Sequence, residues 1–257
     1  MLGFLDRLRW SAERDAPFPD PHRAILARSV PQVAALSPEA RAELEGLVNV
    51  FLAAKRFEGA GGLEVTDAMR VTIAAQACLL VIGRCEGEPY PELVTIVIYP
   101  RAYVAKVSRV GEGGVVVLGH EVRLGESWGA GTVVLAWDAV IAGAADPGDG
   151  QNVVLHEFAH QLDQEDGASD GTPELPFLRY GAWARVLGAA YAGLVDADGR
   201  GRRTVIDRYG ATNPAEFFAV ATEAFFEKPR ALRARHPELY AELAAYYAQD
   251  PAGPVEA

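Results

Sequence analysis

The segment NVVLHEFAHQLDQEDG at 152–167 carries two histidines four residues apart, with a glutamate directly after the first. In a helix, His156 and His160 project from the same face one turn apart, so two imidazole nitrogens can bind one metal ion. Glu157 lies about 100° around the helix, where it can act on water at the metal without being a ligand. The pattern predicts a hydrolytic zinc site in which the metal acidifies water and Glu157 is the general base. The alternative is an ordinary helix that contains the motif by chance.

A catalytic zinc normally has three protein ligands and one open position, so a third ligand must come from elsewhere. The segment NPAEFFAVATEAFFEKP at 213–229 predicts a helix with Asn213 as N-cap and Pro214 at the first helical position. Glu216 then lies in the first turn among apolar residues, where a buried carboxylate is costly unless it is paired or binds a metal. We predict Glu216 as the third ligand. Glu223 lies two turns later on the same face. It could be the third ligand instead, it could support a ligand, or it could be a solvated or salt-bridged side chain.

Asp163 follows His160 by three residues and His156 by seven, and therefore shares their helix face. It is predicted either to orient a ligand imidazole or a partner helix, or to serve only in a turn or a cap. The remaining histidines, which lie in no recognisable ligand pattern, are His22, His120 and His236.

Helical apolar spacing surrounds the motif region on both sides. Before residue 91, Ser37 is predicted to cap one helix, and Thr66 or Asp67 is predicted to cap a second helix that continues to Gly83. After residue 150, helices are predicted at 152–164, 177–194, 214–227 and 229–249.

The stretch from 93 to 140 consists of short runs rich in β-branched residues, separated by turns that contain proline or glycine. It predicts a small mixed sheet of about four strands, the last of which is TVVLAWDAV at 132–140. Helices, then a sheet, then helices again predict an α+β fold rather than a regular alternation of strands and helices.

The composition narrows the class of protein. A net charge of −11 argues against direct nucleic-acid binding, because no face can be strongly basic unless the rest is very acidic. Charged residues interrupt the apolar N-terminus, and no run reaches about 18 uncharged apolar residues, so neither an export signal nor a membrane span is predicted. Cys78 and Cys85, the only cysteines, are predicted to be reduced thiols. We expect a cytoplasmic protein.

Several motifs together resemble the zinc peptidase family typified by Mlc titration factor A, over most of the chain. They are KRFEG at 55–59, IAAQACLL at 73–80, IVIYP at 96–100, GESW and VVLAWD within 125–138, and the two segments at 152–167 and 213–229. The resemblance implies a gluzincin with the catalytic arrangement of the anthrax lethal factor metallopeptidase domain. Matched motif by motif, it implies one zinc ion with His156, His160 and Glu216 as ligands and Glu157 as general base.

The same resemblance singles out Tyr209, in IDRYGATNPAE, seven residues before Glu216. The family carries a tyrosine at this place, which implies a phenol that hydrogen-bonds the oxyanion of the tetrahedral intermediate. The alternative is a loop tyrosine packed on the core. In zincins an edge strand beside the active helix binds the substrate backbone, and TVVLAWDAV is the candidate strand.

The resemblance implies an aminopeptidase-like zinc peptidase with a peptide or protein substrate. It also implies binding of an Mlc-like transcriptional repressor, with regulation of sugar-uptake genes. One alternative is a non-catalytic anti-repressor with a structural or vestigial zinc, and another is a metal hydrolase acting on other carbonyl compounds. Structural zinc is usually enclosed by four Cys or His ligands, and no cysteine lies near the motif. A purely structural site also has no use for a base, so the presence of Glu157 favours catalysis.

The expected organisation has four parts. Residues 1–20 form an N-terminal arm, and residues 21–90 form a helical part packed on the catalytic domain. A zincin-like catalytic domain follows at 91–250, and residues 251–257 form a flexible tail.

Overall fold

The computed structural model describes residues 4–110, 116–123, 125–128 and 131–253, so three residues of the predicted arm and four of the predicted tail lie outside it. Its fold is α+β and zincin-like, as predicted, and combines a small mixed sheet with the helix that carries both motif histidines. The helices are α1 (Phe4–Asp15), α2 (Asp20–Ser29), α3 (Pro38–Ala54), α4 (Asp67–Leu79), α5 (Trp137–Ala145), α6 (Val153–Asp163), α7 (Tyr180–Gly199), α8 (Pro214–Glu227), α9 (Pro229–Arg235) and α10 (Pro237–Tyr247). Short 3-10 helices are η1 (Pro31–Ala35), η2 (Phe177–Arg179) and η3 (Arg208–Ala211).

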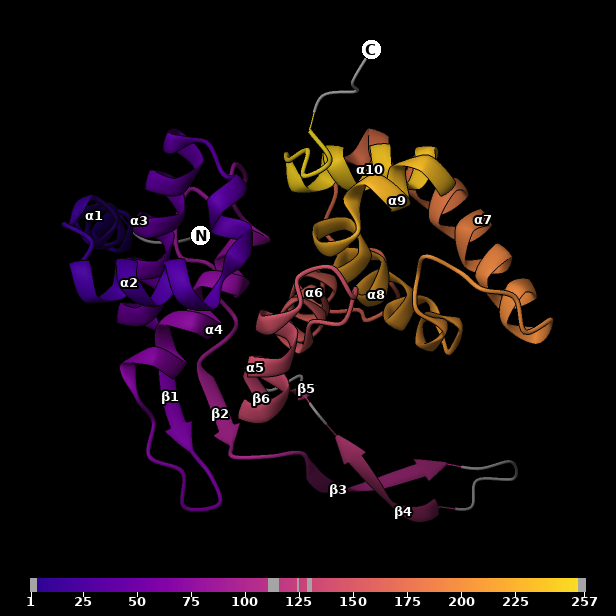
Figure 1. Cartoon of the computed structure of the whole chain (residues 1–257), viewed down its shortest axis with the longest axis horizontal. Helices are drawn as coiled ribbons and strands as arrows, with labels where there is room; N and C mark the ends of the chain where they lie inside the picture. The colour runs from indigo at the N-terminus through magenta and orange to yellow at the C-terminus, as the bar shows by residue number, and fades with distance from the viewer. Residues whose placement is uncertain (1–3, 111–115, 124, 129–130, 254–257) are drawn as a thin grey trace.

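The described strands form two separate sheets. The strands are β1 (Arg56–Gly59), β2 (Thr95–Tyr99), β3 (Tyr103–Val110), β4 (Val116–Arg123), β5 (Gly125–Trp128) and β6 (Thr132–Ala136). The main sheet has the order β1-β2-β6-β5, in which the first three strands are parallel and β5 is antiparallel to β6. The antiparallel β3–β4 pair extends away from the helices at the bottom of the view (Figure 1).

Three predictions about the sheet were wrong. The runs that form β3 and β4 were expected in the same sheet as β2 and β6, but among the described strands they pair only with each other. The run at 132–140 is a strand only to Ala136, because the alanine-rich residues after it, with Asp138 in the first turn, favour the helix α5. This strand, β6, lies between β2 and β5 and is therefore not an edge. The outer position next to it belongs to β5, whose sequence GESW has no β-branched residue and therefore shows only a weak strand pattern.

The helix boundaries follow the capping residues closely. Ser37 and Thr66 cap α3 and α4 as predicted, accepting hydrogen bonds from backbone amides at 3.2 and 3.3 Å. Three predicted helices differ in extent: α4 ends at Leu79 and passes through turns to Gly83, α7 runs from 180 to 199, and the predicted helix at 229–249 is two helices. The last break falls at His236, because Pro237 has no amide hydrogen and disfavours helical geometry in the residue before it.

Figure 1 shows α1–α4 on one side of the molecule and α7, α9 and α10 on the other, with α5, α6 and α8 between them. The inner face of α6 is fixed by aromatic packing: the ring of the fully buried Phe158 lies 4.9 Å from that of Tyr90 and 5.8 Å from that of Phe51. Truncating a side chain in such a position costs about 3–5 kcal/mol. The core therefore holds α6 rigidly against the N-terminal helices.

The first helix, α1, packs against the rest of the chain. Trp10 on α1 is buried, and Arg14 donates a hydrogen bond to the Cys85 carbonyl at 2.7 Å.

Both cysteines are free thiols, as predicted, and Cys78 is fully buried. No helix in the described part of the chain is both long and apolar enough to cross a membrane.

Candidate metal site

The two motif histidines lie on α6, whose start is fixed by Asn152. The Asn152 side-chain oxygen accepts hydrogen bonds from the amides of Val154 and Leu155, both at 3.1 Å. One and two turns further on, the rings of His156 and His160 lie 4.9 Å apart, with side chains 14% and 11% exposed. The N-cap thus sets the register that places both imidazoles on one face.

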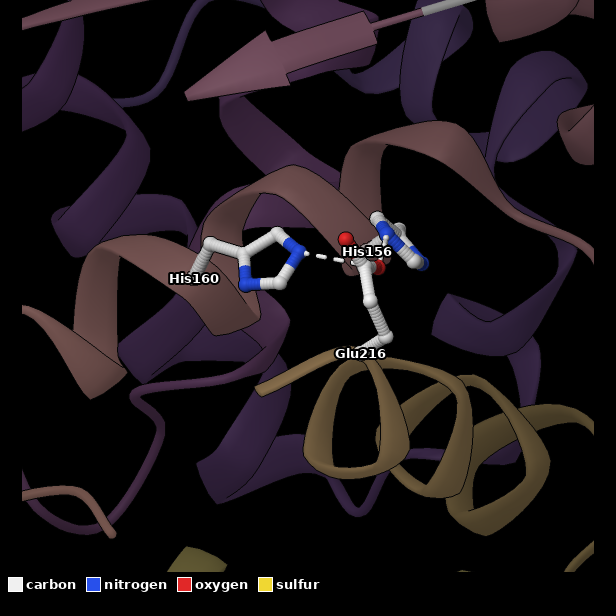
Figure 2. Close-up of side chains that lie close together, drawn as sticks. All are labelled: His156, His160 and Glu216. Carbon is white, nitrogen blue, oxygen red and sulfur yellow. Dashed lines mark hydrogen bonds and ion pairs between the residues drawn. The ribbon is translucent and has the colours of Figure 1, made fainter. Parts of the chain in front are cut away.

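Glu216 reaches the histidines from the first turn of α8. Asn213 caps this helix by accepting from the Glu216 amide at 2.9 Å, and Pro214 occupies its first turn. Glu216 Oε2 lies 3.1 Å from His156 Nε2 and 3.4 Å from His160 Nε2 (Figure 2). One potential ligand atom from each residue lies within 4.8 Å of the others, a spacing that can hold a metal ion. The structure therefore brings all three predicted ligands together.

The charge of the site suits a cation. Burial alone would raise the pKa of Glu216, but hydrogen bonds with His156 and His160 outweigh it and hold that pKa well below its usual range. Burial would likewise lower the pKa of His156, yet hydrogen bonds with Glu216 and Glu223 raise it well above its ordinary value. The two carboxylates therefore favour positive charge at the imidazole between them. A divalent ion supplies such positive charge, so these residues fit a metal.

Glu223 lies two turns after Glu216 but on the other side of the His156 ring. Its Oε1 is 2.8 Å from His156 Nδ1, whereas Glu216 approaches Nε2. Its Oε2 accepts the backbone N–H of Asn152 at 2.5 Å. Of the alternatives that the sequence left open, the geometry favours a supporting residue over a third ligand.

Glu157 is buried in the wall of a cleft of about 1120 Å³ that also contains the three candidate ligands. Gly125, the first residue of β5, lies against its side chain, so that a Cβ atom at position 125 would come within 2.6 Å of Glu157 Oε1 and 2.7 Å of its Cγ. The edge strand and the predicted base are therefore neighbours, and only a glycine leaves room for the observed side-chain position.

Tyr209 lies on η3 and lines the same cleft. Asp207 fixes the turn by accepting from the Tyr209 amide at 2.8 Å. The tyrosine ring centre is 6.0 Å from that of His156, and the side chain is 54% exposed. Tyr209 is thus a half-exposed cleft residue rather than a core residue.

Asp163 makes its described hydrogen bonds to a loop. It is fully buried, and its Oδ2 accepts the Gly171 amide at 3.0 Å, while its Oδ1 has no partner among the described residues. Burial raises the pKa of Asp163 to about 6. A Cβ atom at Gly171 would lie 2.4 Å from the carbonyl oxygen of Pro214, at the start of α8. Asp163 therefore holds this loop by a hydrogen bond at the point where the loop packs against the start of α8, the helix that carries Glu216.

One supporting residue was not predicted from the sequence. Gln76 on α4 is 1% exposed and accepts a hydrogen bond from Asn152 Nδ2 at 2.7 Å. The available signal was an isolated glutamine in the otherwise apolar run IAAQACLL, since a buried amide needs a hydrogen-bond partner. A sequence cannot name that partner 76 residues away.

Two histidines on one helix, a glutamate on a later helix and a mixed sheet beside them are features of the zincin-like metallopeptidase class. The profile of the glucose-regulated metallo-peptidase M90 family matches residues 5–248, and the chain belongs to this family. It is 42% identical to an uncharacterized protein of Synechocystis over 97% of this chain and 92% of that protein. It is 35% identical to Mlc titration factor A of Klebsiella pneumoniae, over 88% of this chain and 85% of that protein. The same-named protein of Edwardsiella ictaluri is 34% identical, over 93% and 90% respectively.

Proposed function

We propose that this chain is a zinc-dependent metallopeptidase, aminopeptidase-like, that hydrolyses bonds in peptides or proteins. The observation that carries the proposal is the convergence of His156, His160 and Glu216 in one cleft with Glu157. His156, His160 and Glu216 would hold the zinc ion, which would supply Lewis acidity to polarise the scissile carbonyl and acidify water.

The remaining steps fall to the side chains of the cleft. Glu157 takes the proton of the attacking water and returns it to the leaving amine. Tyr209 donates a hydrogen bond to the oxygen that gains negative charge, because its half-exposed side chain lies in the cleft beside His156. Both residues line the cleft that holds the candidate ligands.

The substrate backbone binds along β5. Among the described strands, only β6 pairs with β5, so its outer edge is available for an added strand. Gly125 at the start of this edge lies against Glu157. A peptide paired with β5 therefore passes the predicted base.

The proposal is tested by zinc analysis together with cleavage of chromogenic aminoacyl and peptide substrates. We expect the wild type to contain about one zinc per chain. Glu157→Ala keeps the zinc and loses activity about 10²–10⁴-fold, the usual contribution of a positioned base. Glu174→Ala, at an exposed glutamate, is the control and stays fully active. A zinc-free wild type would refute the site, and an active Glu157→Ala would refute the catalytic role.

A second function is favoured by the names of the relatives. Those proteins are called Mlc titration factor A, and we propose that this chain also binds an Mlc-like transcriptional repressor and so affects sugar-uptake genes. Binding of a purified Mlc-like repressor to the wild type and to Glu157→Ala tests this directly. Equal binding by both proteins separates the two functions. A chain that binds zinc and repressor but cleaves no substrate would be a non-catalytic anti-repressor.

A further inference from the structure

Behind His156 lies a buried chain of hydrogen bonds that begins at its Nδ1 atom. Glu223 Oε1 is 2.8 Å from this nitrogen, and Glu223 Oε2 accepts the backbone N–H of Asn152 at 2.5 Å. Glu223 is 5% exposed and Asn152 is 1% exposed. Both oxygens of the Glu223 carboxylate are therefore hydrogen-bonded, one to the imidazole of His156 and one to the backbone of Asn152, the N-cap of α6.

Asn152 is itself held on every side. Its Oδ1 caps α6 by accepting from the amides of Val154 and Leu155. Its Nδ2 donates to Gln76 Oε1 at 2.7 Å and to Glu227 Oε1 at 3.0 Å. The backbone N–H that holds Glu223 is thus anchored to α4, α6 and α8 together, and it cannot shift without breaking several buried hydrogen bonds.

We propose that Glu223, fixed by Asn152, is a positioning residue that keeps the His156 proton on Nδ1 and directs the Nε2 lone pair toward Glu216 and the metal. An ionised carboxylate has no hydrogen to donate, so the imidazole nitrogen facing it must be the donor. A neutral imidazole with its proton on Nδ1 has only Nε2 free to bind a metal. This inference rests on the proposed metal site.

The competing explanation is that Glu223 only joins α6 to α8. That role would change the free energy of unfolding but not the affinity of the folded protein for zinc. Glu223→Gln separates the two, because glutamine has the same shape but places an NH₂ group against one of two N–H donors. We expect zinc affinity, measured by competition with a chromogenic chelator, to fall about 10–100-fold, as for other partners of ligand histidines.

The matched control is Glu227→Gln, one turn further along α8. Glu227 also accepts a hydrogen bond from Asn152, but no contact joins it to His156 in the described structure. Its replacement should change zinc affinity less than about 2-fold, because it does not touch a ligand and the oxygen of the new glutamine can still accept the Asn152 hydrogen bond. An equal loss of affinity in both variants would refute a specific role for Glu223.

Nitrogen-15 NMR of the zinc-loaded protein supplies a readout that a purely structural role would not move. With histidine labelled, wild-type His156 should show an Nδ1–H proton protected from exchange, and Glu223→Gln should lose that protection. Unchanged zinc affinity in Glu223→Gln, or a His156 proton on Nε2 in the wild type, would overturn the inference and leave the metal site intact. If Glu223→Gln does not fold, the wild-type spectrum decides alone. A wild type without zinc would instead refute the proposed function.

Discussion

Gly125 of β5 and Glu157 of α6 are in direct contact, since a Cβ atom at position 125 would lie 2.6 Å from the Glu157 carboxylate. The same atom would also lie 2.8 Å from Val153 Cγ2. A side chain at this position must therefore displace the predicted base, the strand, or both. The contact ties the position of the base to the strand that we propose as the binding edge.

Gly125→Ala should lower peptidase activity at least about 10-fold, because a displacement of about 1 Å at a reacting group is costly. Zinc content should stay unchanged, since the three atoms nearest to the added Cβ belong to Glu157 and Val153 and to none of the three ligands. The control is Gly188→Ala on α7, where a Cβ atom meets nothing within 4 Å. A fully active Gly125→Ala would show that the contact does not restrain Glu157.

Gly171→Ala should weaken zinc binding, because the added Cβ would lie 2.4 Å from the Pro214 carbonyl and push on the start of α8, which carries Glu216. Gly167→Ala is a matched control: both glycines have positive φ, 80° and 90°, but a Cβ at 167 meets nothing within 4 Å. Both substitutions cost stability of about 1 kcal/mol from the backbone conformation. Thermal unfolding and zinc competition should show that only Gly171→Ala loses affinity, and equal affinities would contradict the prediction.

Tyr209→Phe should lower kcat by about 10²-fold, as the loss of one oxyanion donor does elsewhere, with a smaller change in KM. Thermal stability and zinc content should stay the same, because the side chain is half-exposed and its hydroxyl is not among the three ligands. Steady-state kinetics on one chromogenic substrate provides the measurement. A change confined to KM would indicate a role in substrate binding instead.

Glu227→Gln should stabilise the metal-free protein at pH 8 but not at pH 4. Burial raises the pKa of Glu227 from 4.5 to about 7, against the effect of a hydrogen bond from Asn152, and the nearby Glu223 and Asp149 add to the rise. The folded state thus holds this proton more tightly than the unfolded state, so stability falls as pH rises from about 4.5 to about 7. Glutamine removes this loss, a gain on the order of 3 kcal/mol above pH 7. Urea unfolding at both pH values tests it, with the exposed Glu238→Gln as control.

Peptides that carry lysine or arginine should be cleaved about 10-fold faster than peptides that carry aspartate or glutamate, and the difference should shrink at high salt. The reason is the charge of the cleft: no lysine or arginine lines it in the described structure, and its acidic residues are Asp149, Glu157, Asp170, Asp207, Glu216 and Glu223. The substitution Asp170→Asn, at the exposed rim, should reduce the preference without changing zinc content. A preference for acidic peptides would contradict it.

The residues of the candidate site were predictable because local rules place them. Spacing within one helix brings His156 and His160 to one face, and a strong capping pattern puts Glu216 in a first turn. Tyr209 came only from the family resemblance, since its place in the cleft depends on the path of a loop. Strand order was less accessible, because β5 is four residues long and pairs with β6 through contacts that periodicity does not encode. The partner of Gln76 was likewise beyond local rules, because it lies 76 residues further along the chain.

The contact between His156 and Glu216 joins residues 60 positions apart, so the site is complete only after α6 and α8 have docked. A metal that binds there favours the docked state over every open form of the chain. By mass action, metal at one hundred times its dissociation constant adds about 2.7 kcal/mol to the folded state. The amount of intact protein would then follow the free metal supply of the cell, since chains without metal open more often and are degraded sooner.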